Sequence, residues 1–377
     1  MSEYKTPGQL IEALLAERGW SQRTLALVIG KGDTAINKII VGKQSLDADT
    51  ALLLEEVFSV PASDFLALQH SYDLGVARLS SRPDPARANR AHLFGGLPIP
   101  EMAKRGWLGA VNPKNVAEVE SALAAFFGVA SANEIEILPH AARKTEVNTE
   151  PSPAQLAWLY RVRAMASEMI VPRFSQQALD GAIRELKSLL VSAENVRKVP
   201  RILADAGIRF VVVETLPAAK IDGVCFWLND HSPVVGMTLR HDRNDNFWFV
   251  LRHELEHVRL GHGKTEMILD AELDGERAGT GPGVPEEERL ANDAAANFCI
   301  AQSQMQAFID RKAPLFSERD MIGFARSLGV HPGIVAGQLQ HRTGRYERFR
   351  QHLAKIRSYI LPTSYVDGWG NIAPVGE

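Results

Sequence analysis

The pattern His-Glu-x-x-His at residues 253–257 constrains the fold more than any other feature of the chain. On an α-helix, His253 and His257 lie one turn apart on the same face, close enough for both imidazoles to bind one metal ion. Glu254 is then angled to activate a water molecule at that metal. The residues around the motif are strongly apolar, which predicts a buried helix that Gly261 can end. The alternative is a chance occurrence of the pattern on a core helix.

A zinc ion held by two histidines and a water molecule needs one more ligand, normally a carboxylate from a following helix. The sequence predicts that helix over 286–308, and it offers four acids: Glu286, Glu287, Glu288 and Asp293. Its expected apolar face runs through Leu290, Ala291, Ala294 and Phe298. Glu287 points most nearly along that face, Glu288 lies at its edge, and Asp293 faces away. Helix geometry therefore favours Glu287 and leaves Glu288 open.

Residues 200–345 resemble the ImmA/IrrE family of metallopeptidases. The resemblance is carried by the motif helix, by the pair Ala291-Asn292, and by the run V-H-P-G-I-V-A-G-Q-L-Q at 330–340. In that family the ligand glutamate usually lies three residues before an Ala-Asn pair, which here is Glu288. The resemblance therefore implies a zinc metalloendopeptidase whose zinc ligands are His253, His257 and Glu288, with Glu254 as the catalytic residue; Glu287 stays open as the third ligand.

Other polar residues near the motif have simpler interpretations. His262 is expected to be a loop residue or a hydrogen-bond donor to a ligand, and not itself a ligand. Arg252 and Glu256 are spaced for an ion pair on the outer face of the helix. The two cysteines, Cys225 and Cys299, stand in separate apolar runs and are expected to be buried thiols in a reducing compartment.

Residues 6–70 predict a series of short helices. Thr6 followed by Pro7 begins the first, and Ser21 begins the second. The third covers 34–41, and Asp47 or Asp49 begins the fourth. Two short helices joined by a tight turn containing glycine form the helix-turn-helix unit, whose second helix enters the DNA major groove.

Positive charge is concentrated on this predicted unit. From Arg18 to Lys43 there are five basic residues and one acid, a net charge of +4, whereas the whole chain has a net charge of -3. The rest of the first 75 residues is acidic, so the positive surface coincides with the part that would meet phosphate. The alternative is a small helical domain with a solvated basic edge.

Residues 6–73 resemble the HigA-type antitoxins, a branch of the phage-repressor-like helix-turn-helix regulators. The matching residues include Gly19-Trp20-Ser21-Gln22, Leu25-Ala26, Gly42-Lys43, Asp49-Thr50-Ala51 and Tyr72-Asp73. By the family pattern, Gln22 contacts backbone phosphate, and Lys43 follows the reading helix. The residues implied on that helix are Thr34, Asn37 and Lys38. Lys31-Gly32-Asp33 stands where family members often carry serine.

The remaining chain divides by composition. Residues 76–100 are polar, with two nearby prolines, and predict a helical extension followed by a linker. Residues 101–200 are rich in alanine at helical spacing and predict a helical middle segment, interpreted as a bundle. Buried strands are expected at 208–213, 224–228 and 233–239, and a surface loop at 263–285. This predicts a helix-turn-helix domain at 1–75, a metallopeptidase-like domain at 201–345 and a basic C-terminal tail at 346–377.

The predicted fold class is mainly α, with a five-helix N-terminal domain and an α+β domain that combines a small sheet with the motif helix. A chain of 377 residues with 45% hydrophobic and 23% charged residues suits two or three globular domains. No apolar run approaches the ~18 residues needed to cross a membrane, and the first residues lack the pattern of a signal peptide. We therefore expect no membrane partner and a cytoplasmic protein.

These features predict a DNA-binding transcriptional regulator or antitoxin, of a toxin-antitoxin or stress-response system, that carries a zinc-dependent peptidase domain. The expected partners are operator DNA, a second copy of the chain in a homodimer, and a toxin protein or a repressor substrate. The alternative is a non-catalytic regulator whose metallopeptidase-like domain is structural or senses a ligand. A stand-alone peptidase with a degenerate first domain is disfavoured by the local +4 charge.

Overall fold

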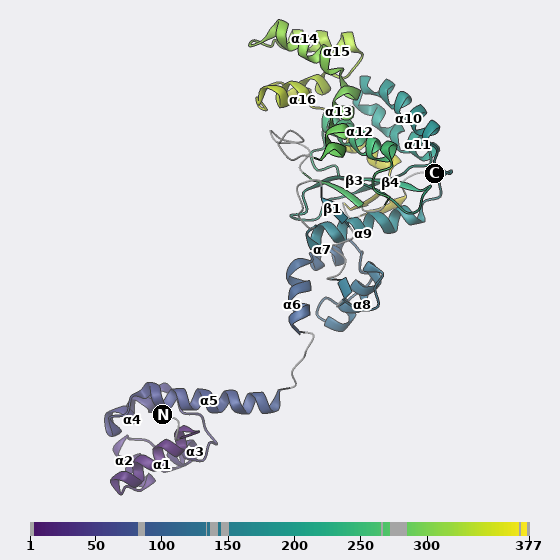
Figure 1. Ribbon diagram of the computed structural model, residues 1–377. Coiled ribbons are helices and arrows are strands. Elements are labelled where there is room, and N and C mark those ends of the chain that lie inside the picture. The colour runs from purple at the N-terminus through teal and green to yellow at the C-terminus, as the bar shows by residue number, and fades with distance from the viewer. Residues whose placement is uncertain are drawn as a thin grey trace. The chain divides into compact units, whose positions relative to one another are not determined.

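The computed structural model describes residues 4–81, 87–132, 134–135, 142–144, 151–264, 267–271, 285–368 and 371–374. The chain divides into two units, Met1–Arg87 and Ala88–Glu377. Each unit has its own hydrophobic core. Figure 1 labels most of their helices and some of their strands. The predicted fold class, mainly α with an α+β part, is confirmed.

Unit 1 is formed by five helices: α1 (Pro7–Arg18), α2 (Gln22–Val28), α3 (Asp33–Ile40), α4 (Ala48–Phe58) and α5 (Ala62–Ser80). Their starts follow from capping side chains, because the oxygens of Thr6, Ser21 and Asp47 accept hydrogen bonds from the first turns of α1, α2 and α4. The core of the unit contains Leu25 and Phe65, both fully buried. The five-helix expectation for this segment is confirmed.

Unit 2 is built on a seven-stranded sheet with the strand order β1-β5-β3-β4-β2-β6-β7. The strands are β1 (Ala142–Lys144), β2 (Arg209–Val213), β3 (Ile221–Trp227), β4 (Pro233–Met237), β5 (Met267–Ala271), β6 (Tyr365–Gly368) and β7 (Asn371–Pro374). β3 runs antiparallel to both of its neighbours, β4 and β5. β2 is parallel to β4 and to β6. The sheet is therefore mixed.

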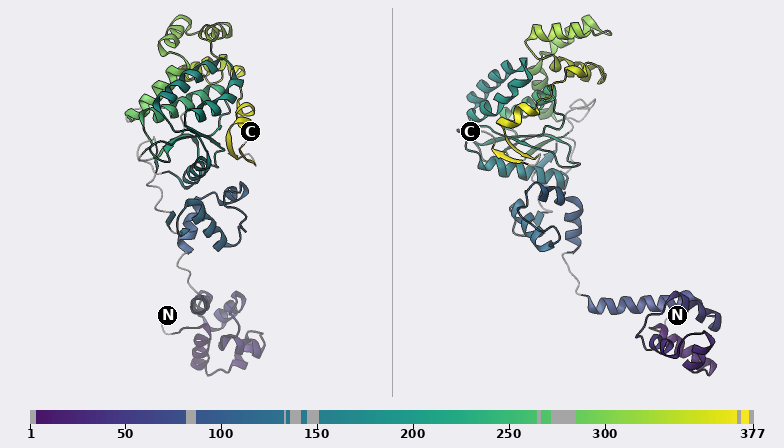
Figure 2. Two further views of the ribbon diagram at one scale, coloured as in Figure 1. Left: turned by 90° about the vertical axis from the view of Figure 1, so that its right-hand side faces the viewer. Right: turned by 180° about the vertical axis from the view of Figure 1, so that it is seen from behind.

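Alternating side chains of the central strands enter two different cores. On β2, Phe210 and Val212 belong to one core, and Val211 and Val213 to the other. The first core contains helix α12 (Asn244–Leu260), and the second contains helix α9 (Pro153–Glu168). This alternation places one helical layer on each face of the sheet, as Figures 1 and 2 show.

The other helices of unit 2 extend these layers. On the face that carries α12 lie α10 (Gln176–Ser188), α11 (Val199–Asp205), α13 (Glu286–Cys299), α14 (Gln302–Lys312), α15 (Glu318–Leu328), α16 (Pro332–Thr343) and α17 (Arg357–Ile360). Helices α7 (Ile99–Lys104) and α8 (Val116–Phe127) contribute to the α9 core, and α6 (Arg87–Gly96) precedes them. The helices of segment 101–200 thus lie on both faces of the sheet and do not form a bundle of their own.

Three expectations about the end of the chain were wrong. The helix predicted over 286–308 is two helices, because Ile300 has an extended backbone between α13 and α14. The basic tail predicted at 346–377 contains β6, which pairs with β2 inside the sheet. The loop predicted at 263–285 contains β5, and residues 272–284 lie outside the described part.

None of the described helices combines the length and the hydrophobicity that a membrane-spanning helix requires.

Candidate functional site

Helix α12 carries the His-Glu-x-x-His motif through the interior of unit 2. The helix ends at Gly261, which adopts φ of 74° and donates its N–H to carbonyls of the last turn. Near its start, Trp248 donates its indole N–H to the Asn244 side chain at 3.0 Å. The helix packs against β3, α13 and α16. As a result, His253, Glu254 and His257 are all 0% exposed.

The two motif histidines and Glu288 form a compact group of donor atoms. The Nε2 atoms of His253 and His257 are 3.0 Å apart. The Glu288 carboxylate oxygens lie 3.3 Å from His253 Nε2 and 3.5 Å from His257 Nε2. In a tetrahedral zinc site with bonds of about 2.0–2.1 Å, ligand atoms lie about 3.3 Å from one another. Two imidazoles and a carboxylate at these separations fit a zinc ion.

Helix α13 brings Glu288, and not Glu287, to the histidines. Glu288 is 3% exposed, whereas Glu287 is exposed. The expected apolar face was wrong because Leu290 is 39% exposed. The buried face of α13 is formed by Glu288, Ala291, Ala295, Phe298 and Cys299. Glu286 and Asp293 are exposed and do not belong to the donor group.

Each histidine of the donor group has a polar neighbour at its other ring nitrogen. The Nδ1 atom of His253 lies 3.0 Å from the amide oxygen of Asn292 on α13. The Nδ1 atom of His257 lies 3.0 Å from Nδ1 of His262, which follows the end of α12. Burial, and next the proximity of His257, lower the pKa of His262. His262 is therefore a hydrogen-bond neighbour of a donor residue and lies outside the three-residue donor group.

The carboxylate of Glu254 lies directly over the backbone of β3. A methyl group at Gly223 would stand 2.0 Å from Glu254 Oε1. Gly223 lies on the same side of β3 as Cys225, which belongs to the core around α12. The pairing of β3 with β5 is irregular between Ile221 and Gly223. Glycine at this position leaves the space that the catalytic candidate occupies.

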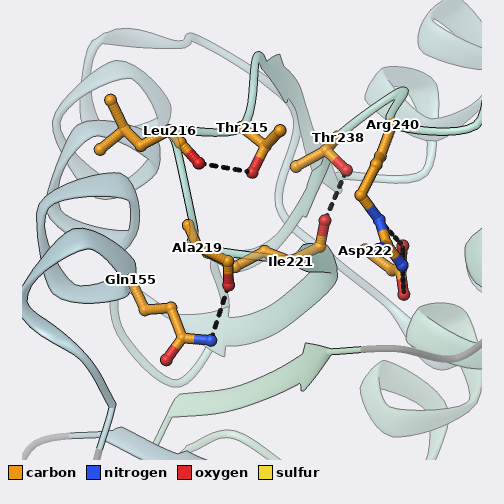
Figure 3. A network of polar contacts seen from close by, with 8 residues as sticks. All are labelled: Gln155, Thr215, Leu216, Ala219, Ile221, Asp222, Thr238 and Arg240. Atoms are coloured by element: carbon orange, nitrogen blue, oxygen red, sulfur yellow. Dashed lines mark hydrogen bonds and ion pairs between the residues drawn. The ribbon is translucent and has the colours of Figure 1, made fainter. Parts of the chain in front are cut away.

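Polar contacts fix the backbone that leads to Gly223, as Figure 3 shows. Thr238 donates its hydroxyl to the carbonyl of Ile221 at 2.7 Å. The Arg240 guanidinium binds the buried carboxylate of Asp222 at 2.9 Å. Gln155 of α9 donates its amide to the carbonyl of Ala219 at 2.8 Å. The start of β3 is thus held from the segment that follows β4 and, through Ala219, from the opposite helical layer.

The ion pair expected between Arg252 and Glu256 forms at 2.6 Å, but it is buried and not on an outer face. Arg259 also binds the Glu256 carboxylate. Burial alone would raise the pKa of Glu256, but hydrogen bonds from Arg259 and Arg252 outweigh it and lower the pKa below its ordinary value. Both cysteines are buried thiols, as expected, and burial raises the pKa of Cys299 to about 12.

In unit 1, α2 and α3 form a helix-turn-helix pair joined by 29–32. Helix α3 buries Ile36, Ile39 and Ile40. Thr34, Asn37 and Lys38 are exposed on its opposite side. Three polar side chains on the solvent face of the second helix match the arrangement that reads base edges in a major groove.

The other residues expected to contact DNA, Gln22 and Lys43, have different surroundings from those of the basic residue Arg18. Lys43 is exposed just after α3, and Gln22 is half-buried at the first position of α2. Arg18 instead donates to the carbonyl of Val57 at 2.6 Å and lies over the rings of Trp20 and Phe58. Arg18 therefore supports the packing of α1 on α4. The positive charge on and next to α3 comes from Lys31, Lys38 and Lys43, while Arg23 pairs with Asp33 at 3.8 Å.

Two neighbours of the motif were not singled out by sequence reasoning. Asn292 was noted only as part of a family pattern, although its position four residues after Glu288 puts both on one helix face. No sequence pattern pointed to Gly223, because its relation to Glu254 depends on how β3 packs against α12.

His331 caps α16, where its Nδ1 accepts a hydrogen bond from Gly333, and it lies outside the donor group.

Comparison with known proteins identifies one part of the chain. Residues 11–65 match the family model described as helix-turn-helix. These residues span α2 and α3, and the match supports a DNA-binding domain at the N-terminal end of the chain. No curated protein matches the sequence. The helix-turn-helix domain of residues 11–65 is therefore the family assignment that comparison provides.

Proposed function

We propose that this chain is a DNA-binding transcriptional regulator that carries a zinc-dependent peptidase module of the ImmA/IrrE type. The observation that supports the second part most strongly is the group of His253, His257 and Glu288, whose donor atoms lie within 4.8 Å of one another. Glu254 adjoins this group on the same helix, as the chemistry of peptide hydrolysis requires. The regulator part is supported by the helix-turn-helix match and by the exposed polar side of α3.

In this proposal the two histidines and Glu288 hold a zinc ion, which supplies a Lewis acid for a peptide carbonyl and for water. Glu254 is the general base: its carboxylate takes a proton from the attacking water and passes it to the leaving amine. Gly223 leaves the space in which that carboxylate lies. β3 packs against α12, the helix that carries Glu254 and both histidines.

On DNA, we propose that Thr34, Asn37 and Lys38 face the major groove. In the same proposal Gln22 and Lys43 contact backbone phosphate, and the Lys38 ammonium reaches the phosphates that line the groove. A homodimer would present two copies of α3 to two half-sites. The proposed role is that of an antitoxin or a stress-response regulator, with operator DNA and a toxin protein or a repressor substrate as partners.

One observation favours a second candidate function, a non-catalytic regulator in which the zinc site is structural or senses a ligand. His253, Glu254 and His257 are 0% exposed, and Glu288 is 3% exposed. Structural zinc sites are closed, whereas catalytic sites keep an open coordination position. The two candidates share the same ligands and differ in whether Glu254 has a chemical task.

Metal content tests the proposed ligands. We expect about one zinc per purified chain, lost in His253→Ala and His257→Ala and retained in Glu254→Gln. Glu288→Gln should lose zinc, and Glu287→Gln is the matched control, because the neighbouring carboxylate is exposed. Elemental analysis of the dialysed proteins gives the result. Full retention of zinc by Glu288→Gln would remove α13 as the source of the third ligand.

Peptidase activity is tested by comparing wild type with Glu254→Gln, both loaded with zinc and incubated with extract of the expressing host. New protein N-termini are then identified by mass spectrometry. The peptidase proposal requires N-termini that appear with wild type and not with Glu254→Gln. Identical sets from the two proteins, with zinc bound equally in both, would support the sensor instead.

A further inference from the structure

Resting on the proposed zinc site, we infer that Asn292 and His262 are positioning residues that fix the hydrogen positions of the two ligand imidazoles. A neutral histidine carries hydrogen on one ring nitrogen and a lone pair on the other. Only the nitrogen with the lone pair can bind a metal. The residue that contacts the second nitrogen therefore decides whether the nitrogen facing the site is able to bind.

Asn292 fixes His253. The Nε2 atom of His253 faces His257 and Glu288, while its Nδ1 atom lies 3.0 Å from the Asn292 amide oxygen. An amide oxygen accepts hydrogen bonds and cannot donate them. Nδ1 of His253 must therefore carry the hydrogen, which leaves the Nε2 lone pair directed at the metal.

Helix α13 supplies both the third donor and this positioning contact. Glu288 and Asn292 are four residues apart and so lie on one side of the helix. The buried residues Ala291 and Ala295 let α13 approach α12 closely. Any shift of α13 along α12 would move the ligand carboxylate and the amide oxygen together, so the two contacts to His253 are geometrically coupled.

His262 fixes His257. Their Nδ1 atoms are 3.0 Å apart, so one must donate to the other. Because Nε2 of His257 faces the donor group, its Nδ1 carries the hydrogen and Nδ1 of His262 accepts it. The neutral His262 then carries its own hydrogen on Nε2. This assigns a definite tautomer to each of the three histidines.

The backbone of His262 is held firmly enough to act in this way. Its N–H donates to the carbonyl of His257 at 2.9 Å. Its carbonyl accepts the indole N–H of Trp227 on β3 at 2.8 Å. A methyl group at the neighbouring Gly263 would stand 2.7 Å from the carbonyl oxygen of Cys225, so the turn lies tightly on the strand. The end of α12 and the sheet together fix the position of the His262 ring, whose Nδ1 accepts the hydrogen bond from His257.

The test measures zinc affinity of the full chain by competition with a chromophoric chelator. Asn292→Leu and His262→Leu remove the acceptor, and each should weaken zinc binding by about 10–100-fold, as loss of such partners does at other zinc sites. Asn292→Asp and His262→Asn place an oxygen at the same position and should return affinity to within a few-fold of wild type. Asp293→Leu and His341→Leu change exposed residues on α13 and α16 and serve as controls.

A second measurement separates positioning from a general structural role. Cobalt(II) is bound in place of zinc, and proton NMR follows the shifted, exchangeable N–H signals of the ligand imidazoles. Wild type should show two slowly exchanging Nδ1–H signals, and each leucine variant should lose the slow exchange of one of them. A variant that is merely destabilised would broaden or lose both signals equally.

These measurements distinguish a failure of the positioning roles from a failure of the proposed zinc site. If wild type fails to take up zinc, the metal site is wrong and the positioning roles fall with it. If wild type binds zinc and the leucine variants bind it equally well, only the positioning roles are wrong. An affinity loss that the aspartate and asparagine variants fail to restore would likewise overturn them.

Discussion

The carboxylate of Glu254 and the backbone of Gly223 are so close that residue 223 accepts no side chain without rearrangement. A methyl group there would stand 2.0 Å from Glu254 Oε1. The carboxylate must then move away from the histidines, or the strand must move away from α12. Either change alters the distance between the proposed general base and the proposed ligands, so a residue with no functional group controls the geometry of the site.

We predict that Gly223→Ala lowers the free energy of unfolding by about 1–3 kcal/mol, as overpacking of a close-packed interior does. The cost should nearly vanish in the Glu254→Ala background, because the atoms that the methyl group meets are then absent. Denaturant unfolding of the four proteins of this double-mutant cycle measures the coupling.

The control for this cycle is Gly181→Ala on α10, where an added methyl group has open space. Alanine has the higher helix propensity, so this change should be neutral or stabilising, by up to about 1 kcal/mol. If Gly223→Ala lowers the free energy of unfolding equally in the presence and absence of the Glu254 carboxylate, the result contradicts a contact between residue 223 and that carboxylate.

For single residues, sequence reasoning succeeds where the residues are near one another along the chain. His253 and His257 lie one turn apart on one helix, so their common face follows from helical spacing, and Glu254 directly follows His253. Glu288 could not be chosen from the pattern on α13, because the buried face uses Ala291 and Ala295 while the larger Leu290 is 39% exposed. Small buried side chains give a weak hydrophobic signal.

Helix α12 has a second polar cluster, formed by Arg252, Glu256 and Arg259. Glu256 is 3% exposed and binds both arginines. The hydrogen bonds from the arginines hold its pKa below the ordinary value of 4.5 despite the opposing effect of burial. A carboxylate with a lowered folded-state pKa stabilises the fold above the pKa of the unfolded chain. That stabilisation disappears as the pH falls through the folded-state pKa.

We therefore predict that Glu256→Gln lowers the free energy of unfolding at neutral pH by about 3 kcal/mol, the low end for breaking a buried pair, because Arg259 is partly exposed. The difference from wild type should shrink as the pH falls below about 4.5 and be smallest once the pH lies below the folded-state pKa. Unfolding by denaturant at several pH values measures it. Glu286→Gln, at an exposed pair with Arg289, should change stability little. A difference that stays constant with pH would show that the Glu256 charge is not its source.

The elements that the sequence did not reveal are short strands that pair with segments far away along the chain. β6 has four residues and joins β2, which lies far earlier in the chain. β1, an edge strand of three residues, pairs in parallel with β5, which has five. Runs this short carry little periodicity, so local patterns predict a loop or a tail. By contrast β2 and β4 are buried along most of their length, and their apolar runs were recognised.

At the scale of the whole molecule, the two units have separate cores. The core of unit 1 is formed entirely by residues from Ile11 to Phe65, and the cores of unit 2 begin at Leu97. The described residues therefore include no core shared between the two units. Substitutions on α3 should consequently leave the proposed zinc site unchanged, and substitutions of His253 should leave unit 1 folded.

The last prediction concerns DNA binding by the full chain. Lys38→Ala removes one exposed cation on α3, so the slope of log affinity against log salt should become shallower by about 1 and binding to all sequences should weaken. Asn37→Ala should instead reduce discrimination between operator and random DNA by about 1–3 kcal/mol, with an unchanged salt slope. Both proteins should retain wild-type zinc.

The matched control is Lys198→Ala, which removes an equal charge from an exposed position on unit 2. Titrations of labelled operator and random duplexes at several salt concentrations, followed by fluorescence anisotropy, give both quantities. If α3 is the helix that recognises the DNA sequence, the two α3 substitutions must affect DNA binding differently from each other and from this control. If Lys198→Ala lowers the salt slope as much as Lys38→Ala, the contact with DNA is a diffuse attraction to the whole chain and α3 is not the reading helix.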